Sequence, residues 1–182
     1  MKKGIKEETI RNNANKIRAE ILGHAIEVED LLTEALGHIY CPTNNKFYVH
    51  RIVQDILTDL TFDRKIRIFK KFVELLSESF DHDKKIIENL NLIREKRNQL
   101  AHSNLLLPWI FDENDLNEDG YNFLTKEYKN WKESCEFTKA GKNTFTITVK
   151  ELENYKRLCE FTIISISIGM NKILSEKSNN AT

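Results

Sequence analysis

A helical hydrophobic period runs without a proline from Ile10 to Ile39, and it constrains the fold more than any other feature of the chain. Apolar residues recur there every three or four positions, which places them on one face of an α-helix. Gly23 interrupts the pattern, but an isolated glycine weakens a helix without ending it. We therefore predict one long helix. Its buried face comprises Ile10, Ala14, Ile17, Ile21, Ala25, Val28, Leu32, Ala35 and Ile39.

Two shorter helical patterns follow a predicted turn at residues 41–45, which contain a proline and other turn formers. The apolar positions of the first are Tyr48, Ile52, Ile56 and Leu60. Those of the second are Ile66, Phe69, Phe72, Val73 and Leu76. Thr61 or Asp63 is suited to cap the second helix, because the side-chain oxygen of either residue can accept a hydrogen bond from the first turn.

A fourth helical pattern starts at Asp81 or Asp83 and ends near Ser103. Its apolar positions step by four and three residues through Ile86, Leu90 and Ile93. The next step lands on Arg97, so a guanidinium occupies a position that should be apolar. A buried cation needs a carboxylate, the polar groups of a second subunit or an anionic ligand.

The pattern changes between residues 105 and 148, where a proline, two glycines and an acidic run at 112–119 appear. We interpret this stretch as an insertion. A β-branched alternation at 144–148 predicts that it holds a small β-hairpin.

A closing helix is predicted from Thr148 and Glu151, which fit a capping box. Its apolar period continues to about Leu174, and the polar tail at 175–182 is expected to be frayed. The chain is therefore expected to be mostly α, with one domain over residues 1–182. We predict an up-and-down bundle of about five helices with a β-hairpin or loop insertion before the last helix.

Composition limits the possible functions. The 28 Lys and Arg residues balance 28 Asp and Glu residues, so any contact with nucleic acid must be local. The first residues hold no apolar signal region, and we expect no stretch apolar enough to span a membrane. We therefore expect a cytoplasmic protein. Cys41, Cys135 and Cys159 lack metal-ligand spacing and are expected to be reduced thiols.

Arg97, Asn98 and His102 together offer the groups that RNA cleavage without a metal requires. Such cleavage needs a base for the 2′-hydroxyl proton, an acid for the leaving oxygen and positive charge at the phosphate. His102 suits the proton transfers near neutral pH, Arg97 supplies the charge, and Asn98 would orient the phosphate or the imidazole. An ideal helix places Arg97 and His102 about 140° apart. They could therefore meet through a distorted helix or across a dimer axis.

Five further cations are candidates for guiding RNA: Arg94, Lys96, Arg64, Arg67 and Lys71. A solvated charged face is the simpler explanation for the last three. An arginine and a histidine near a helix end also commonly only complement its dipole and cap it. No aromatic platform for base stacking is apparent. The segment 115–120 begins like a calcium loop, but Lys126 stands where a glutamate is needed, so no metal or cofactor is predicted.

The string Arg97-Asn98-x-x-x-His102 resembles the signature of the HEPN superfamily, which is an arginine, a polar residue and a histidine a few residues later. The order of helices is similar too, with Lys65-Ile66-Arg67-Ile68-Phe69 opening the middle helix. Only the insertion at 105–148 lies outside the resemblance. The resemblance implies a metal-independent endoribonuclease that leaves 2′,3′-cyclic phosphate ends. It also implies a homodimer through the motif helix, with Arg97 and His102 catalytic and Asn98 supporting.

Members of that superfamily serve in toxin–antitoxin pairs, phage defence and RNA processing, so a cognate antitoxin protein is an implied partner. The longer string Ile93-Arg94-x-x-Arg97-Asn98-x-x-Ala101-His102 also resembles helical proteins like the mannitol-operon repressors. That second resemblance implies a non-catalytic dimeric regulator or an RNA- or protein-binding module. Arg97 would then be a structural charge at an interface.

Overall fold

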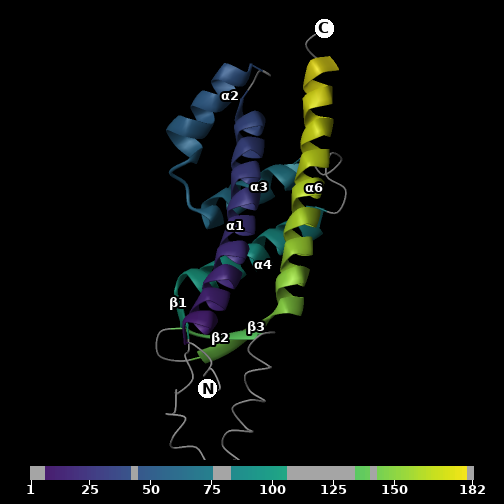
Figure 1. The fold of residues 1–182 in the computed structure, drawn as a ribbon. Helices are drawn as coiled ribbons and strands as arrows, with labels where there is room; N and C mark the ends of the chain where they lie inside the picture. The colour runs from purple at the N-terminus through teal and green to yellow at the C-terminus, as the bar shows by residue number, and fades with distance from the viewer. Residues whose placement is uncertain (1–6, 42–44, 76–82, 106–133, 140–142, 180–182) are drawn as a thin grey trace, which may run out of the picture. The chain divides into compact units, whose positions relative to one another are not determined.

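The computed structural model describes residues 7–41, 45–75, 83–105, 134–139 and 143–179. Helices predominate in those residues, which confirms the predicted mostly α bundle with a β insertion before the last helix (Figure 1). The chain divides into two compact units. Unit 1 combines residues 1–22 and 97–155, and unit 2 combines residues 23–96 and 156–182. The single domain over 1–182 stays a prediction.

Three long helices contribute residues to both units: α1 (Glu7–Tyr40), α4 (Asp83–Ala101) and α6 (Val149–Asn179). Helix α1 confirms the predicted long helix, and Gly23 lies within it. Helix α6 continues past the predicted end near Leu174. The prediction of a frayed tail is therefore wrong for residues 175–179. No proline or glycine follows Leu174 in this helix, and nothing there forces an earlier end. Residues 180–182 lie outside the described residues.

Unit 1 contains a three-stranded antiparallel sheet in the order β1-β2-β3. The strands are β1 (Ser103–Leu105), β2 (Ser134–Lys139) and β3 (Asn143–Thr148). The pairing of β2 with β3 confirms the hairpin predicted within the insertion. Strand β1 was not predicted. It pairs Ser103 with Lys139, and the acidic run and calcium-like segment between them lie outside the described residues.

The last helix begins at the predicted capping box. The backbone N–H of Thr148 donates to the Glu151 carboxylate at 2.8 Å, and the Glu151 N–H donates to Thr148 Oγ1 at 3.1 Å. Each residue thus satisfies a backbone donor at the start of α6. This reciprocal pair fixes where the sheet ends and the helix begins.

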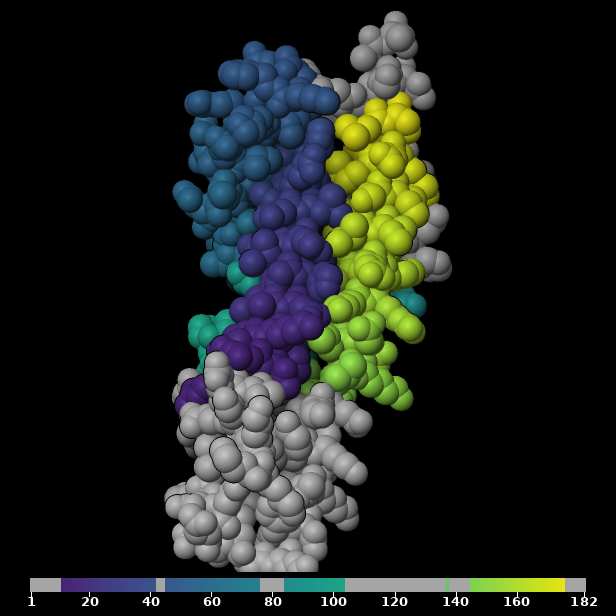
Figure 2. Space-filling model, viewed as in Figure 1, coloured from purple at the N-terminus to yellow at the C-terminus, as the bar shows by residue number. Residues whose placement is uncertain are grey.

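In unit 2, α2 (Lys46–Ile52) continues into a π-helical turn, η1 (Val53–Leu57). The helix was predicted, but its buried face is shifted: Val49 and Leu57 are buried, whereas Tyr48 and Ile56 are exposed. The physical reason is a close approach to α1. A Cβ atom on Gly37 would lie 2.6 Å from Val53 Cγ2 of η1 and 3.3 Å from Val49 Cγ1 of α2, so the glycine admits both side chains. Figure 2 shows the side chains of residues 46–57 lying against those of the second half of α1.

Helix α3 (Phe62–Leu75) is capped by Thr61, whose Oγ1 accepts from the Arg64 N–H at 3.3 Å. The predicted core positions Ile66, Phe69 and Val73 are buried, Phe72 is half-buried, and Leu76 lies outside the described residues. Lys65 is also buried, which the pattern did not predict. Its ammonium forms an ion pair with Glu29 of α1 at 3.0 Å.

The expectation that no stretch could span a membrane is wrong by one measure. Within α6, the range Val149–Ser175 is long and apolar enough by length and composition alone. A core helix of a soluble protein meets the same criterion, so this is weak evidence for a membrane. Cys41 and Cys159 are buried thiols outside any disulfide, as predicted, and the Cys135 side chain lies outside the described residues.

Candidate functional site

The three motif residues lie where α4 ends, as predicted. Arg97 and Asn98 belong to its last turns, Ala101 is its last residue, and His102 forms the turn that follows. The His102 N–H donates to the Asn98 carbonyl at 3.3 Å. The side chains of Asn98 and His102 are exposed, and that of Arg97 is half-buried. The amide and the imidazole therefore face solvent from the end of a well-formed helix.

Two contacts fix the residue that follows the motif. Ser103 is buried, and its hydroxyl donates to the Leu100 carbonyl at 3.0 Å. The Ser103 carbonyl accepts from Arg18 Nη2 of α1 at 2.8 Å. The Arg18 guanidinium also lies 5.5 Å from the ring centroid of Phe137 in β2, which is cation–π distance. His102 is thus held between an anchored helix end and an anchored strand.

Sequence reasoning missed Arg18, because the hydrophobic period of α1 is unbroken at this point. The buried stripe passes from Ala14 through Ile17 to Ile21, so Arg18 stands beside this stripe and does not interrupt it. Arg18 is half-buried, and its buried Nε has no hydrogen-bond partner within the part of the chain that the structure describes. Arg18 is therefore a second half-buried arginine, placed at the edge of the apolar stripe of α1.

The helix does not distort to bring Arg97 and His102 onto one face. Helix α4 is α-helical through Ala101, and the hydrogen bond from His102 to Asn98 keeps the α-helical spacing. Helical geometry then leaves the two residues about 140° apart around the axis. The described backbone therefore does not show the helix distortion that was one of the two predicted ways for Arg97 and His102 to meet.

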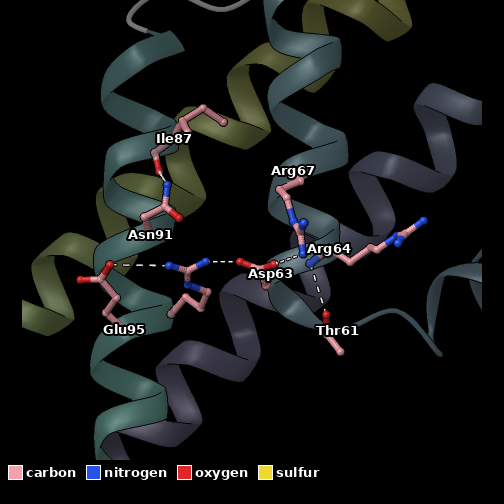
Figure 3. Close-up of polar contacts among 8 residues, drawn as sticks. Thr61, Asp63, Arg64, Arg67, Ile87, Asn91 and Glu95 are labelled. Atoms are coloured by element: carbon pink, nitrogen blue, oxygen red, sulfur yellow. Dashed lines mark hydrogen bonds and ion pairs between the residues drawn. The ribbon is translucent and has the colours of Figure 1, made fainter.

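The five cations predicted to guide RNA belong to one unit, and the three motif residues belong to the other. Arg94, Lys96, Arg64, Arg67 and Lys71 all belong to unit 2. Asp63 of α3 binds both Arg67 and Arg94, and Arg94 Nη2 lies 3.5 Å from Glu95 Oε1 (Figure 3). Arg64 and Lys71 are exposed, and Lys96 is half-buried. Two of the five cations therefore share one carboxylate.

The two arginines change the acidity of that carboxylate. Loss of solvent around Asp63 acts to raise its pKa. The hydrogen bond and charge of Arg67, followed by the charge and hydrogen bond of Arg94, lower it by more. The pKa of Asp63 therefore lies below its ordinary value, and the carboxylate stays ionised throughout the neutral range.

An aromatic surface is present, contrary to the expectation from sequence. Phe47 and Tyr48 on α2 are 65% and 56% exposed, and their ring centroids are 5.8 Å apart at an interplanar angle of 73°. The prediction that Tyr48 belongs to the buried stripe is therefore wrong. The shift of the buried face to Val49 turns both rings toward solvent.

Within the described residues, no group of His, Cys, Asp and Glu side chains is arranged to hold a metal ion. No family model, curated protein or solved structure matches the chain. The chemistry of the site is therefore inferred from its own residues. An exposed imidazole can exchange protons with a bound substrate, and a nearby guanidinium can bind phosphate oxygens through a planar set of donors.

Proposed function

We propose that the protein is an endoribonuclease that cleaves RNA through its own 2′-hydroxyl, without a metal ion. The observation that carries the proposal is the motif at the end of α4, where His102 and Asn98 are exposed and the next residue is anchored by Arg18. The resemblance of Arg97, Asn98 and His102 to the HEPN signature supports the same reaction.

In the proposed reaction, an imidazole of His102 takes the proton of the 2′-hydroxyl, and the oxygen attacks the adjacent phosphorus. The P–O5′ bond breaks, and a protonated imidazole gives its proton to the leaving oxygen. Arg97 stabilises the charge on the non-bridging oxygens, and Asn98 orients the phosphate. The products carry a 2′,3′-cyclic phosphate and a 5′-hydroxyl.

Two copies of the chain supply one site in this proposal. The reaction uses a base and an acid together, whereas each copy brings one motif histidine. The angle of about 140° between Arg97 and His102 also separates them within a helix. A two-fold axis beside the ends of two α4 helices would bring two histidines and two arginines to one phosphate.

The proposed setting is the cytoplasm, where the enzyme would act as a toxin of a toxin–antitoxin pair or in phage defence, restrained by an antitoxin protein. Expression of the wild-type chain should then slow growth, whereas expression of His102→Ala should not. Equal growth inhibition by both chains would refute a toxic role for the cleavage.

The decisive experiment incubates purified protein with a mixed RNA pool in EDTA and maps the new ends. Wild-type protein should produce cyclic-phosphate ends, and His102→Ala and Arg97→Ala should lose at least about a hundredfold in rate. His24→Ala is the matched control, because His24 is bonded to Glu27 in its own helix at 3.1 Å. A His102→Ala protein as active as wild type would refute the proposal.

A second candidate is a non-catalytic dimeric regulator or binding module, and the half-buried position of Arg97 favours it. In that case the guanidinium would be a structural charge at the dimer interface. Arg97→Ala would then weaken the dimer in sedimentation experiments, and RNA would stay intact with every variant. A dimer unaffected by Arg97→Ala would exclude this role.

A further inference from the structure

We infer that the exposed side of α2 binds single-stranded RNA through base stacking and phosphate contacts. The surface consists of Lys46, Phe47, Tyr48, His50 and Arg51, all exposed and all within unit 2. It is separate in sequence from the motif at the end of α4. The choice of RNA as ligand rests on the proposed function.

The position of the Phe47 and Tyr48 rings is fixed by the packing and capping of α2. The opposite side of α2 is buried through Val49 and approaches α1 closely at Gly37. Asn45 caps the helix by accepting a hydrogen bond from the Phe47 N–H at 2.9 Å. Phe47 and Tyr48 therefore remain on the outer side, where a large aromatic side chain is otherwise unfavourable.

The charges around the rings suit a phosphate backbone. Arg51 follows Phe47 by four residues and Tyr48 by three, spacings that make side chains neighbours on a helix. Helix α2 contains no acidic residue. Arg51 pairs with Asp55 of η1 at 2.9 Å, but both side chains are at least half exposed, and such a pair is weak. A phosphate oxygen can replace this carboxylate.

Aromatic rings interleaved with cations favour nucleic acid over a protein partner. Bases stack on aromatic side chains regardless of sequence, while lysine and arginine contact the backbone. Ile56 of η1 is the next exposed apolar residue along the chain and is 57% exposed. The four residues before it include no lysine or arginine. Ile56 therefore provides an internal control of equal exposure and different chemistry.

The test measures binding of a fluorescent 2′-O-methyl oligouridine to the full-length protein. This probe cannot undergo 2′-hydroxyl attack, so its binding is independent of the Arg97 and His102 chemistry. Phe47→Ala/Tyr48→Ala should weaken binding about tenfold or more, since stacking of each base contributes strongly. Ile56→Ala should bind as wild type does. Lys46→Gln/Arg51→Gln should weaken binding and reduce its dependence on salt.

Several results would overturn the inference. One is unchanged affinity of Phe47→Ala/Tyr48→Ala, and another is an equal loss with Ile56→Ala. If the wild type does not bind the probe and the double variant instead changes the sedimentation of the protein, the surface joins copies of the chain. Circular dichroism of each variant separates lost binding from lost folding. Probe binding that depends on the rings, in a protein that cleaves no RNA, would refute only the proposed catalysis.

Discussion

Lys65 and Glu29 form an ion pair with side chains only 6% and 14% exposed. Removing one partner of such a pair leaves the other charge in a poorly solvated position. Lys65→Met should therefore lower the free energy of unfolding by about 3–5 kcal/mol, measured by urea denaturation. Lys65→Met/Glu29→Leu should recover much of that loss. Arg51→Gln, which breaks an exposed pair, is the control and should cost less than about 1 kcal/mol.

Asp63 gives stability a predictable dependence on pH. Its pKa is lower in the folded protein than in the unfolded chain, so the ionised carboxylate favours folding above the unfolded-state pKa. That contribution is lost as the pH falls through the folded-state value. Asp63→Asn should melt at a lower temperature than wild type at neutral pH, and the gap should close below about pH 4. An unchanged gap in acid, or one shared by the exposed Asp59→Asn, would contradict this origin.

Much of the motif was predictable from sequence because a charge in an apolar stripe is visible as a break in a period. Arg97, Asn98 and His102 lie at the helix end where the sequence placed them. Arg18 does not break the period of α1, and its role depends on a carbonyl 85 positions away in the chain. Side-chain contacts at that separation leave no local trace in the sequence.

Among the helices, α1 offers two glycines with opposite expected responses. A Cβ on Gly23 would meet nothing within 4 Å, so Gly23→Ala should stabilise the protein by about 0.5–1 kcal/mol through helix propensity. A Cβ on Gly37 would lie 2.6 Å from Val53, a β-branched side chain with little freedom to move. Gly37→Ala should therefore destabilise by about 1–3 kcal/mol. Thermal melts that rank the two variants the other way would contradict the close approach of α2.

The start of α6 depends on its capping box. Glu151→Ala removes the acceptor for the Thr148 N–H and should cost about 0.5–2 kcal/mol. Glu160→Ala, at an exposed position farther along the same helix, should change stability by less than about 0.5 kcal/mol. Equal losses from the two variants in denaturant melts would show that the box contributes nothing specific.

Periodicity predicted the long elements well because a helix repeats its burial pattern many times. It failed for the buried face of α2, because so short a helix does not repeat its pattern often enough to distinguish two neighbouring faces. There the close approach at Gly37 and the π-helical turn moved burial from Tyr48 to Val49. It could not predict β1, since three residues hold no pattern and the pairing of Ser103 with Lys139 is non-local.

For the molecule as a whole, α6 is the element that bears on where the protein resides. Its buried positions in unit 2 follow one helical stripe, Cys159, Thr162, Ile166, Met170 and Ile173. Phe161, Ile164 and Ile168 are exposed on the same helix. Because one face is committed to the core, we expect the protein in the aqueous fraction after ultracentrifugation of a lysate. Recovery in the membrane pellet, resistant to carbonate washing, would contradict this expectation.

The sheet of unit 1 has a consequence for how such a chain can change over time. Strand β1 ends at Leu105, opposite Phe137, and β2 starts at Ser134, a short step of roughly 10 Å along the same neighbouring strand. The chain thus leaves the sheet and rejoins it at almost one place. The distance between these two ends is set by the pairing of β1 with β2 and not by the number of residues between them, so a change in the length of 106–133 need not alter that pairing.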